Sequence, residues 1–159
     1  MNKALLIKTL CETVESDLQV IKEAALAAHK AATDPENKAE NAYDTRGLEA
    51  SYLAGAQAKR VAELEEVLFY CRNTEPKEFG PADTIAPSAL VEIDMSQKTS
   101  WVFIVVKGAG MNVSFEGRNI QTITPTSPLG EGLMGLKKGD TAEIEQGNHT
   151  RECKIVSVF

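Results

Sequence analysis

The feature that most constrains the fold of this chain is a regular alternation of apolar spacings in its first third. Spacings of four and three residues follow one another at eight positions, namely Ile7, Cys11, Val14, Leu18, Ile21, Ala25, Ala28 and Ala32. This alternation places the side chains on one face of a helix, as the seam of a coiled coil requires. Charged residues between these positions keep the opposite face in water. The segment is therefore predicted to be one long amphipathic helix.

A break and a second helix follow this segment. Pro35 lacks a backbone donor and disfavours helical geometry in Asp34, so the helix should end near residue 33 and a tip loop should span 33–41. The same alternation resumes from about Asn41 and continues through Gly47, Ala50, Ala54, Gln57, Val61, Leu64, Leu68 and Cys71. Two helices joined by a short polar loop predict an antiparallel coiled-coil hairpin over residues 1–72.

The composition of the two seams changes along the predicted hairpin. Alanine and glycine dominate near the loop, whereas leucine, valine and isoleucine dominate at the other end. Small residues let helices approach closely, so the tip should be slender and the base more strongly packed. About thirty residues per helix, at about 1.5 Å each, make a rod roughly 45 Å long. So thin a rod has little core of its own, and its length needs a functional explanation.

Beyond residue 72 the sequence changes character. Residues 73–81 contain two prolines and a glycine without periodicity, which indicates a linker. The remainder, 82–159, is predicted to be β-rich, and the whole chain α+β. The strand candidates are 90–95, 101–106, 120–124, 142–144 and 153–158, and Gly108–Gly110 is expected to form a hairpin connection. Between them, Ser127 as N-cap, Pro128 at the first helical position and a terminal Gly135 predict a short helix packed on the sheet.

Charge and cysteine content narrow the functional classes. A net charge of −6 disfavours broad binding to a nucleic-acid backbone, which needs clustered Lys and Arg, although an acidic chain can act on nucleic acid through a protein partner. Cys11, Cys71 and Cys153 lack the spacing of a zinc site or a disulfide framework, so we expect reduced thiols in the cytoplasm. No apolar run approaches the length of a membrane span, so we expect neither secretion nor membrane insertion.

Two segments carry a resemblance to a known family. Residues 123–140 read ITPTSPLGEGLMGLKKGD, a Ser-Pro short helix before a Gly-Asp turn. At the tip, residues 40–44 read ENAYD and are followed by Arg46, Tyr52 and Gly55. Together these segments resemble the C-terminal signature and the tip motif of the GreA/GreB family of transcript-elongation factors. The resemblance covers nearly the whole chain, and its C-terminal part is the more specific.

This resemblance implies a partner, RNA polymerase, and a mode of action. The coiled coil would enter the secondary channel of the polymerase, and a C-terminal domain of FKBP-like fold would grip the channel rim. The chain would act as a monomer without catalysing a reaction alone, with indirect contact to the nascent RNA and the DNA of the elongation complex. Family members use acidic tip residues to hold a second Mg²⁺ and a water, so that the polymerase hydrolyses backtracked RNA.

The site residues implied by the resemblance fall into two groups. At the tip, the acids would act at the polymerase active site, with Glu36 and Glu40 as Mg²⁺ ligands only in the complex, and Arg46 would contact RNA or polymerase. The polymerase-binding positions of the C-terminal domain are Ser127, Pro128, Leu129 and Gly130, and the tip acids are Asp34, Glu36 and Glu40.

The tip departs from the family pattern in its acid spacing. The family has one acid three residues before the Glu of Glu-Asn-Ala-Glu-Tyr, but counting back from Glu40 reaches the neutral Asn37. With Tyr43 as the anchor, the two acid positions fall on Glu36 and Ala39. Either register keeps one acid and loses the other, so polymerase binding is the firmer expectation and RNA cleavage the weaker.

Five alternatives remain open at this level. A homologue could occupy the channel without supporting cleavage. An FKBP-like fold also allows a peptidyl-prolyl isomerase or peptide-binding chaperone, although such a pocket needs an aromatic lining and aromatic residues make up only 6% of the chain. The hairpin could instead be a plain dimerisation module. The tip acids could simply solubilise a loop, and Ser127–Gly130 could serve only as a helix start.

Overall fold

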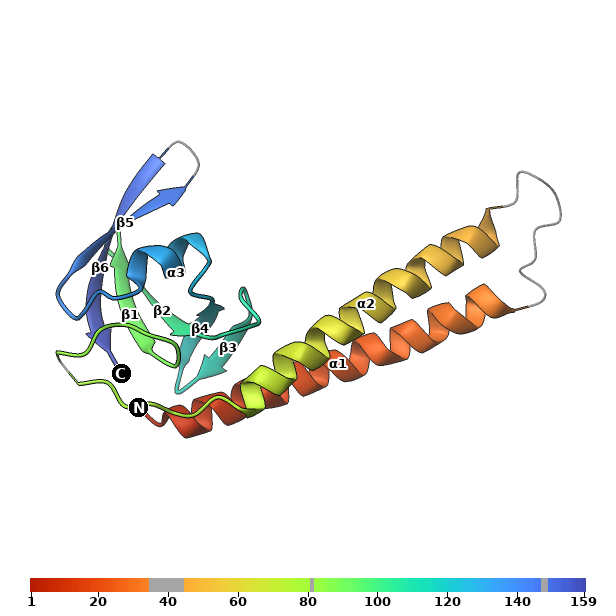
Figure 1. Ribbon diagram of the computed structural model, residues 1–159, viewed down its shortest axis with the longest axis horizontal. Helices are drawn as coiled ribbons and strands as arrows, with labels where there is room; N and C mark the ends of the chain where they lie inside the picture. The colour runs from red at the N-terminus through yellow and green to blue at the C-terminus, as the bar shows by residue number, and fades with distance from the viewer. Residues whose placement is uncertain (35–44, 81, 147–148) are drawn as a thin grey trace. The chain divides into compact units, whose positions relative to one another are not determined.

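The computed structural model describes residues 1–34, 45–80, 82–146 and 149–159. Two long helices are followed by strands and one short helix, so the chain has the predicted α+β architecture (Figure 1). The elements divide into two compact units, Glu12–Phe69 on the one hand and Met1–Cys11 with Tyr70–Phe159 on the other. The first turns of the first helix therefore group with the β-rich part of the chain.

The predicted helical hairpin is present, with α1 at Lys3–Thr33 and α2 at Arg46–Arg72. The Asn2 side chain accepts a hydrogen bond from Leu5 N at 3.1 Å, as an N-cap does, and Thr45 begins α2 by donating to the Glu49 carboxylate at 2.8 Å. In the described part of the chain, neither helix is long and apolar enough to cross a membrane.

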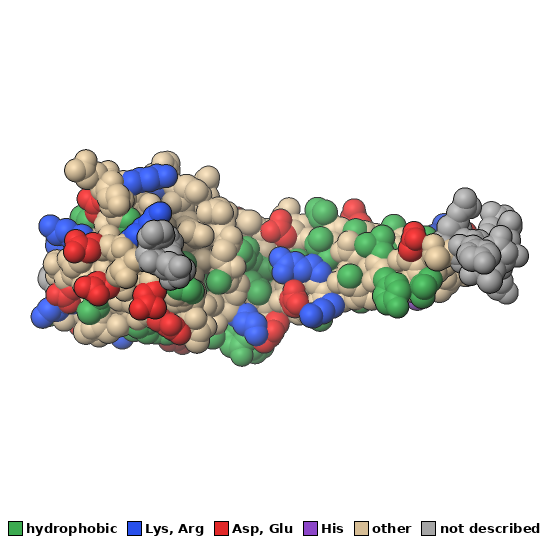
Figure 2. All heavy atoms as spheres, turned by 90° about the horizontal axis from the view of Figure 1, so that it is seen from above, with side chains coloured by type: hydrophobic (Ala, Val, Ile, Leu, Met, Phe, Trp, Pro, Cys, Tyr) green, Lys and Arg blue, Asp and Glu red, His purple; other side chains and the backbone are tan. Residues whose placement is uncertain are grey.

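Burial along the two helices confirms the seam. Every predicted seam position is at least partly buried, and the large residues at the base are buried most deeply, with Val14 at 0% and Leu64 at 4% exposure. The alanines and glycines of the distal seam are mostly only half-buried. On the face that Figure 2 shows, hydrophobic and charged side chains alternate along the hairpin. The large exposed apolar residues on its helices include Leu26, Leu48, Tyr52 and Leu53.

The β-rich part contains a six-stranded sheet in the order β3-β4-β2-β1-β6-β5. All neighbouring pairs are antiparallel except β2 and β4, which are parallel and align Trp101 with Ile120. The strands are β1 Leu90–Met95, β2 Lys98–Ile104, β3 Asn112–Phe115, β4 Arg118–Ile123, β5 Thr141–Gln146 and β6 His149–Val158.

The sheet differs from the sequence prediction at one edge. The strand β3 was not predicted, and the expectation of a hairpin connection at Gly108–Gly110 was wrong. The chain leaves β2, forms the edge strand β3 and returns as β4, so consecutive strands β2 and β3 are not neighbours. The segment instead closes around the buried Thr122, whose backbone oxygen accepts a hydrogen bond from Gly110 N at 2.7 Å.

The core of the β-rich part lies on the face of the sheet that α3, at Pro128–Leu133, covers (Figure 1). Alternate residues of the strands supply it, as the two-residue period of a strand requires. Its fully buried members include Val91, Ile93, Ile104, Leu133 and Ile155. This packing fixes the position of α3 relative to β5.

The cysteines correct a second expectation. Cys11 and Cys71 form a disulfide with a Cα–Cα distance of 5.9 Å, so the prediction of three unpaired thiols was wrong for these two. The physical reason is that an antiparallel hairpin brings together positions 60 residues apart, which spacing rules for local motifs do not detect. Cys153 is free and buried.

Candidate functional site

The short helix α3 begins as the sequence predicted. The Ser127 hydroxyl accepts a hydrogen bond from Gly130 N at 3.1 Å and donates to the Thr124 carbonyl oxygen at 2.8 Å. Pro128 occupies the first helical turn, where a missing N–H costs nothing. Gly135 follows the helix with φ +79°, a conformation that side chains rarely adopt. The Ser127 side chain therefore links Thr124, which precedes the helix, to Gly130 in its first turn.

Gly130 is buried beneath this turn. A methyl group at this position would collide with the Thr124 carbonyl oxygen and come within 2.9 Å of its carbon. Gly132 faces β5 in the same way, because a side chain there would meet Ile144. Glycine at these positions lets α3 lie directly against its neighbours, so Gly130 acts through packing rather than through exposed contact.

Three of the four positions that the resemblance singled out line one cavity. Ser127, Pro128 and Leu129 form its wall on the α3 side, and its volume is about 470 Å³. The lining is mainly aliphatic and contains no aromatic side chain. Its other members are Met95, Ala109, Gly110, Gln121, Thr122, Ile123, Ile144 and Glu145. Such a cavity suits an aliphatic side chain of a partner.

The outer side of α3 is acidic. Pro128 also lines a second hollow of about 440 Å³, together with Gly132 and three glutamates. Those three, Glu131, Glu143 and Glu145, are all exposed, and Glu145 lies on the rim of both cavities. The described residues contain no group of three or more His, Cys, Asp or Glu side chains that could hold a metal ion. The three exposed carboxylates give this side of α3 a negative charge.

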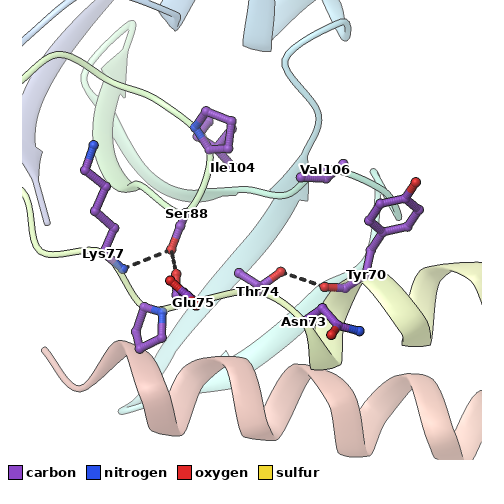
Figure 3. A pocket seen from close by; sticks show the side chains of 10 residues that line it. Tyr70, Asn73, Thr74, Glu75, Lys77, Ser88, Ile104 and Val106 are labelled. Atoms are coloured by element: carbon purple, nitrogen blue, oxygen red, sulfur yellow. Dashed lines mark hydrogen bonds between the residues drawn. The ribbon is translucent and has the colours of Figure 1, made fainter.

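A third cavity, which the sequence did not reveal, lies where α2 passes into the linker. It measures about 600 Å³ and is lined by Tyr70, Asn73, Thr74, Glu75, Pro76, Lys77, Pro87, Ser88, Ile104 and Val106. Figure 3 shows the hydrogen bonds that shape it: Ser88 donates to Glu75 O at 2.8 Å and accepts from Lys77 N at 3.3 Å, and Thr74 donates to Tyr70 O at 2.8 Å. Residues 74–77 of the linker are thus held in place by hydrogen bonds.

The N-terminal turn of α1 is fixed to the same region by a buried lysine. Lys3 is 2% exposed, its Nζ donates to Ser88 O at 3.3 Å, and it lies 4.6 Å from the Phe79 ring centroid. Burial lowers the pKa of Lys3, while the nearby Glu78 carboxylate opposes this shift. This contact could not be predicted from the sequence, because a lysine side chain is ordinarily solvated.

Of the predicted tip residues, Asp34 and Arg46 lie within the described part of the chain. Asp34 directly follows α1 and is half-buried, and Arg46 is the first residue of α2. Glu36 and Glu40, the implied Mg²⁺ ligands, lie outside the described residues. Their arrangement and their fit to a metal ion stay predictions.

Comparison with known proteins finds relatives that align with nearly the whole chain. The chain is similar to transcription elongation factor GreA of Methylococcus capsulatus, with 26% identity over 165 residues that cover 99% of this chain and 98% of that protein. It is also similar to GreA of Acidiphilium cryptum, with 28% identity over 92% of this chain and 91% of that protein.

Among solved structures, GreA factor homolog 1 of Thermus thermophilus is 22% identical, with a TM-score of 0.38 and coverage of 94% of each chain. The family model for the C-terminal part of transcription elongation factor GreA/GreB matches residues 80–159, which contain all six strands, α3 and its cavities. This match spans half of the chain, and the chain therefore belongs to the GreA/GreB family of transcription elongation factors.

Proposed function

We propose that this chain binds bacterial RNA polymerase in the cytoplasm, places its hairpin in the secondary channel and modulates elongation. The observation that carries the proposal is the cavity beside α3, within the part of the chain that matches the family. The motif residues Ser127, Pro128 and Leu129 meet there on a rigid support. A binding surface gains precision when its residues lie on packed elements, as these do.

The chemistry of this surface describes the partner it suits. The aliphatic cavity would accept an apolar side chain, and the neighbouring glutamates would attract Lys or Arg around it. An apolar centre with a charged rim is the usual composition of a protein–protein interface. A rim of carboxylates also speeds association with a basic surface and repels nucleic-acid backbone. This surface therefore favours contact with the polymerase protein rather than with RNA or DNA.

The length and thinness of the hairpin support the second part of the proposal, its insertion into the secondary channel. Its helices have 31 and 27 residues, and their distal seams are built from small side chains. A long, thin pair of helices can carry a few tip residues into a deep channel, which a compact domain cannot do. Asp34, Glu36 and Glu40 would reach the polymerase active site in this way, with Arg46 near the RNA.

Stimulated RNA cleavage is the finer part of the proposal. Carboxylate oxygens are suitable Mg²⁺ ligands, and a second Mg²⁺ shared with the polymerase would stabilise the attacking and leaving oxygens of phosphodiester hydrolysis. The catalytic centre would be that of the polymerase, so the chain itself is not proposed to be an enzyme. The displaced acid spacing favours a weak cleavage factor or a factor that occupies the channel without cleavage.

The isomerase alternative is less well supported. A proline-binding pocket of the FKBP type needs an aromatic lining, and the cavity beside α3 has none among its lining residues. A proline-peptide turnover assay tests this alternative directly.

Binding is tested with charge reversal at the acidic rim. Glu143→Lys and Glu145→Lys should each weaken binding to core RNA polymerase by about tenfold, because each change replaces an attraction by a repulsion. Glu116→Lys makes the same charge change in the β3–β4 turn, outside all three cavities, and should leave the affinity unchanged. If the rim variants bind as tightly as the wild type, the assignment of this surface is wrong.

Cleavage is tested on backtracked elongation complexes with Mg²⁺. Short 3′ RNA fragments should appear with the wild type and diminish with Glu36→Ala or Glu40→Ala, while Glu63→Ala on the shaft of α2 should have no effect. Tight polymerase binding without any fragments would exclude the cleavage function and leave the channel-occupying one.

A further inference from the structure

We propose that Cys11 and Cys71 are a reversible thiol–disulfide pair that controls the base of the helical hairpin. Cys11 lies in the third turn of α1, and Cys71 is the last residue but one of α2. Their Cα atoms are 5.9 Å apart, within the range that disulfides adopt without backbone movement. The pair can therefore form and break while both helices keep their positions.

The environment of the two sulfur atoms suits exchange rather than permanent closure. Cys71 is 6% exposed, whereas Cys11 is only partly buried, so Cys11 is the member of the pair with more exposure to solvent and to small thiols. Cys71 Sγ also lies 3.7 Å from the Ile7 carbonyl oxygen, within the distance of a hydrogen bond to sulfur. After reduction the buried thiol has this acceptor available, so the reduced state does not leave it without a partner.

The proposed cytoplasmic location indicates that the disulfide is reversible rather than structural. If the chain works with RNA polymerase in the cytoplasm, as proposed above, its disulfide is exposed to a reducing pool. Cytoplasmic disulfides in most organisms are transient or redox-sensing rather than structural. This step rests on the proposed function, whereas the geometry of the pair does not.

The position of the pair decides what it controls. The chain passes from one compact unit to the other directly after Cys11 and directly before Tyr70. The disulfide therefore joins α1 to α2 next to both of these boundaries. Tyr70, Asn73 and Thr74 next to Cys71 form part of the wall of the cavity in Figure 3. Breaking the disulfide removes a covalent restraint on the last turn of α2, so this turn, and with it this wall, opens locally more often while the helices keep their mean positions.

The chemistry balances with a low-molecular-weight disulfide as the oxidant. The Cys11 thiolate attacks one sulfur of that disulfide, forms a mixed disulfide and releases one small thiolate. The Cys71 thiolate then attacks the Cys11 sulfur and releases the second small thiolate. Two protein thiols and one small disulfide become one protein disulfide and two small thiols, with the two protons passing to the released thiolates. Reduction by small thiols is the reverse sequence.

Thiol counting in redox buffers tests the proposal. The protein is equilibrated at graded ratios of reduced to oxidised glutathione, quenched in acid, unfolded and labelled with a maleimide that shifts its mobility. We expect the labelled thiols to rise from one, Cys153, to three as the buffer becomes more reducing, within ratios that span the cytoplasmic range. Three thiols at every ratio would show that the pair does not form, and one thiol at every ratio would show a permanent structural bond. Either result would overturn the proposal.

Matched variants identify which cysteines account for the change in thiol count. Cys153→Ser should keep the transition, with zero and two thiols at its ends, whereas Cys11→Ser should show two thiols at every ratio. Oxidation should raise the Tm of wild type by about 10 °C, because the disulfide closes a long loop and restricts the unfolded chain. Cys11→Ser should lack this shift. Amide hydrogen exchange at 70–74 should accelerate on reduction of wild type only, and equal exchange in both states would contradict the role in the hairpin base.

This test is independent of polymerase binding. Thiol counts and exchange rates are measured on the chain alone, so a failure of polymerase binding leaves them interpretable. Conversely, binding with an unchanged thiol count would support the proposed function and reject the redox control.

Discussion

The β-rich part of the chain and the distal hairpin restrict their side chains in different ways. Around α3 the backbone itself comes so close that a single methyl group at Gly130 has no room. In the hairpin, Gly55 has nothing within 4 Å of the place where a methyl group would lie. Packing around α3 therefore leaves no room for a side chain at Gly130, whereas the exposed Gly55 has open space around it. An added methyl group should therefore destabilise the first region and be tolerated in the second.

The largest effect is expected from Gly130→Ala. The added carbon collides with the Thr124 backbone, which the Ser127 side chain holds in place, so the turn before α3 must shift. We expect a loss of about 3 kcal/mol in the free energy of unfolding. Urea unfolding followed by Trp101 fluorescence measures it, because Trp101 is the single tryptophan and lies in β2. A loss below about 0.5 kcal/mol, the range of ordinary surface substitutions, would show that the turn is adaptable and break the comparison.

A smaller loss is expected from Ser127→Ala. The variant removes the acceptor for Gly130 N and the donor to Thr124 O, so it should cost about 1 kcal/mol. Ser127→Thr keeps both hydrogen bonds and is the matched control. If alanine is tolerated as well as threonine, Ser127 does not stabilise α3, and its place in the motif must come from partner contact alone.

The sequence patterns predicted the helices of both regions but missed one strand of the sheet. The cap and glycine signals around α3 are local, so they located Ser127 and the helix correctly. The heptad pattern located both long helices, since it repeats over many turns. The edge strand β3 was missed because it has only four residues, with buried Val113 and Phe115 as its whole signal.

Features that depend on three-dimensional register could not be predicted. The Cys11–Cys71 pairing follows from which turns of two helices face each other, and a change of one turn would separate the sulfurs. The burial of Lys3 depends on Ser88 and Phe79, more than seventy residues away. For the tip acids, the family resemblance implies a role although their spacing departs from the family pattern, and this role stays a prediction because Glu36 and Glu40 lie outside the described residues.

In the hairpin, Gly55→Ala should stabilise rather than destabilise. Alanine favours the helical state by up to about 1 kcal/mol over glycine, and α2 offers no obstacle to its methyl group. Helical circular dichroism during thermal unfolding measures the gain. If polymerase affinity falls at the same time, the open space at Gly55 is occupied by the partner. A loss of stability in the isolated chain would show that the hairpin restricts this position as the β-rich part restricts Gly130.

The smallest expected effect is a pH dependence of the free energy of unfolding, which arises from Lys3 in the first turn of α1. Burial lowers the pKa of Lys3 below the usual lysine value of 10.5, with Glu78 opposing and Lys77 assisting the shift. Between the lowered pKa and 10.5 the unfolded chain binds the proton more readily than the folded one. The Lys3 contribution to the free energy of unfolding therefore rises with pH through this window.

Cys153 acts in the opposite direction, so the Lys3 effect has to be isolated. Burial, with the Asp94 carboxylate as a further cause, raises the pKa of the Cys153 thiol above 9.0, and stability from this group falls as pH rises above that value. Both wild type and Lys3→Met contain Cys153, so its contribution cancels in their difference. That difference, from urea unfolding followed by Trp101 fluorescence, should shift in favour of wild type as pH increases towards 10.5. Lys8→Met, on the exposed side of α1, controls for the loss of one positive charge. A difference that is flat or that moves against wild type would mean that Lys3 is solvated in solution, and the base of α1 would then be less firmly attached to Ser88 and Phe79 than its contacts indicate.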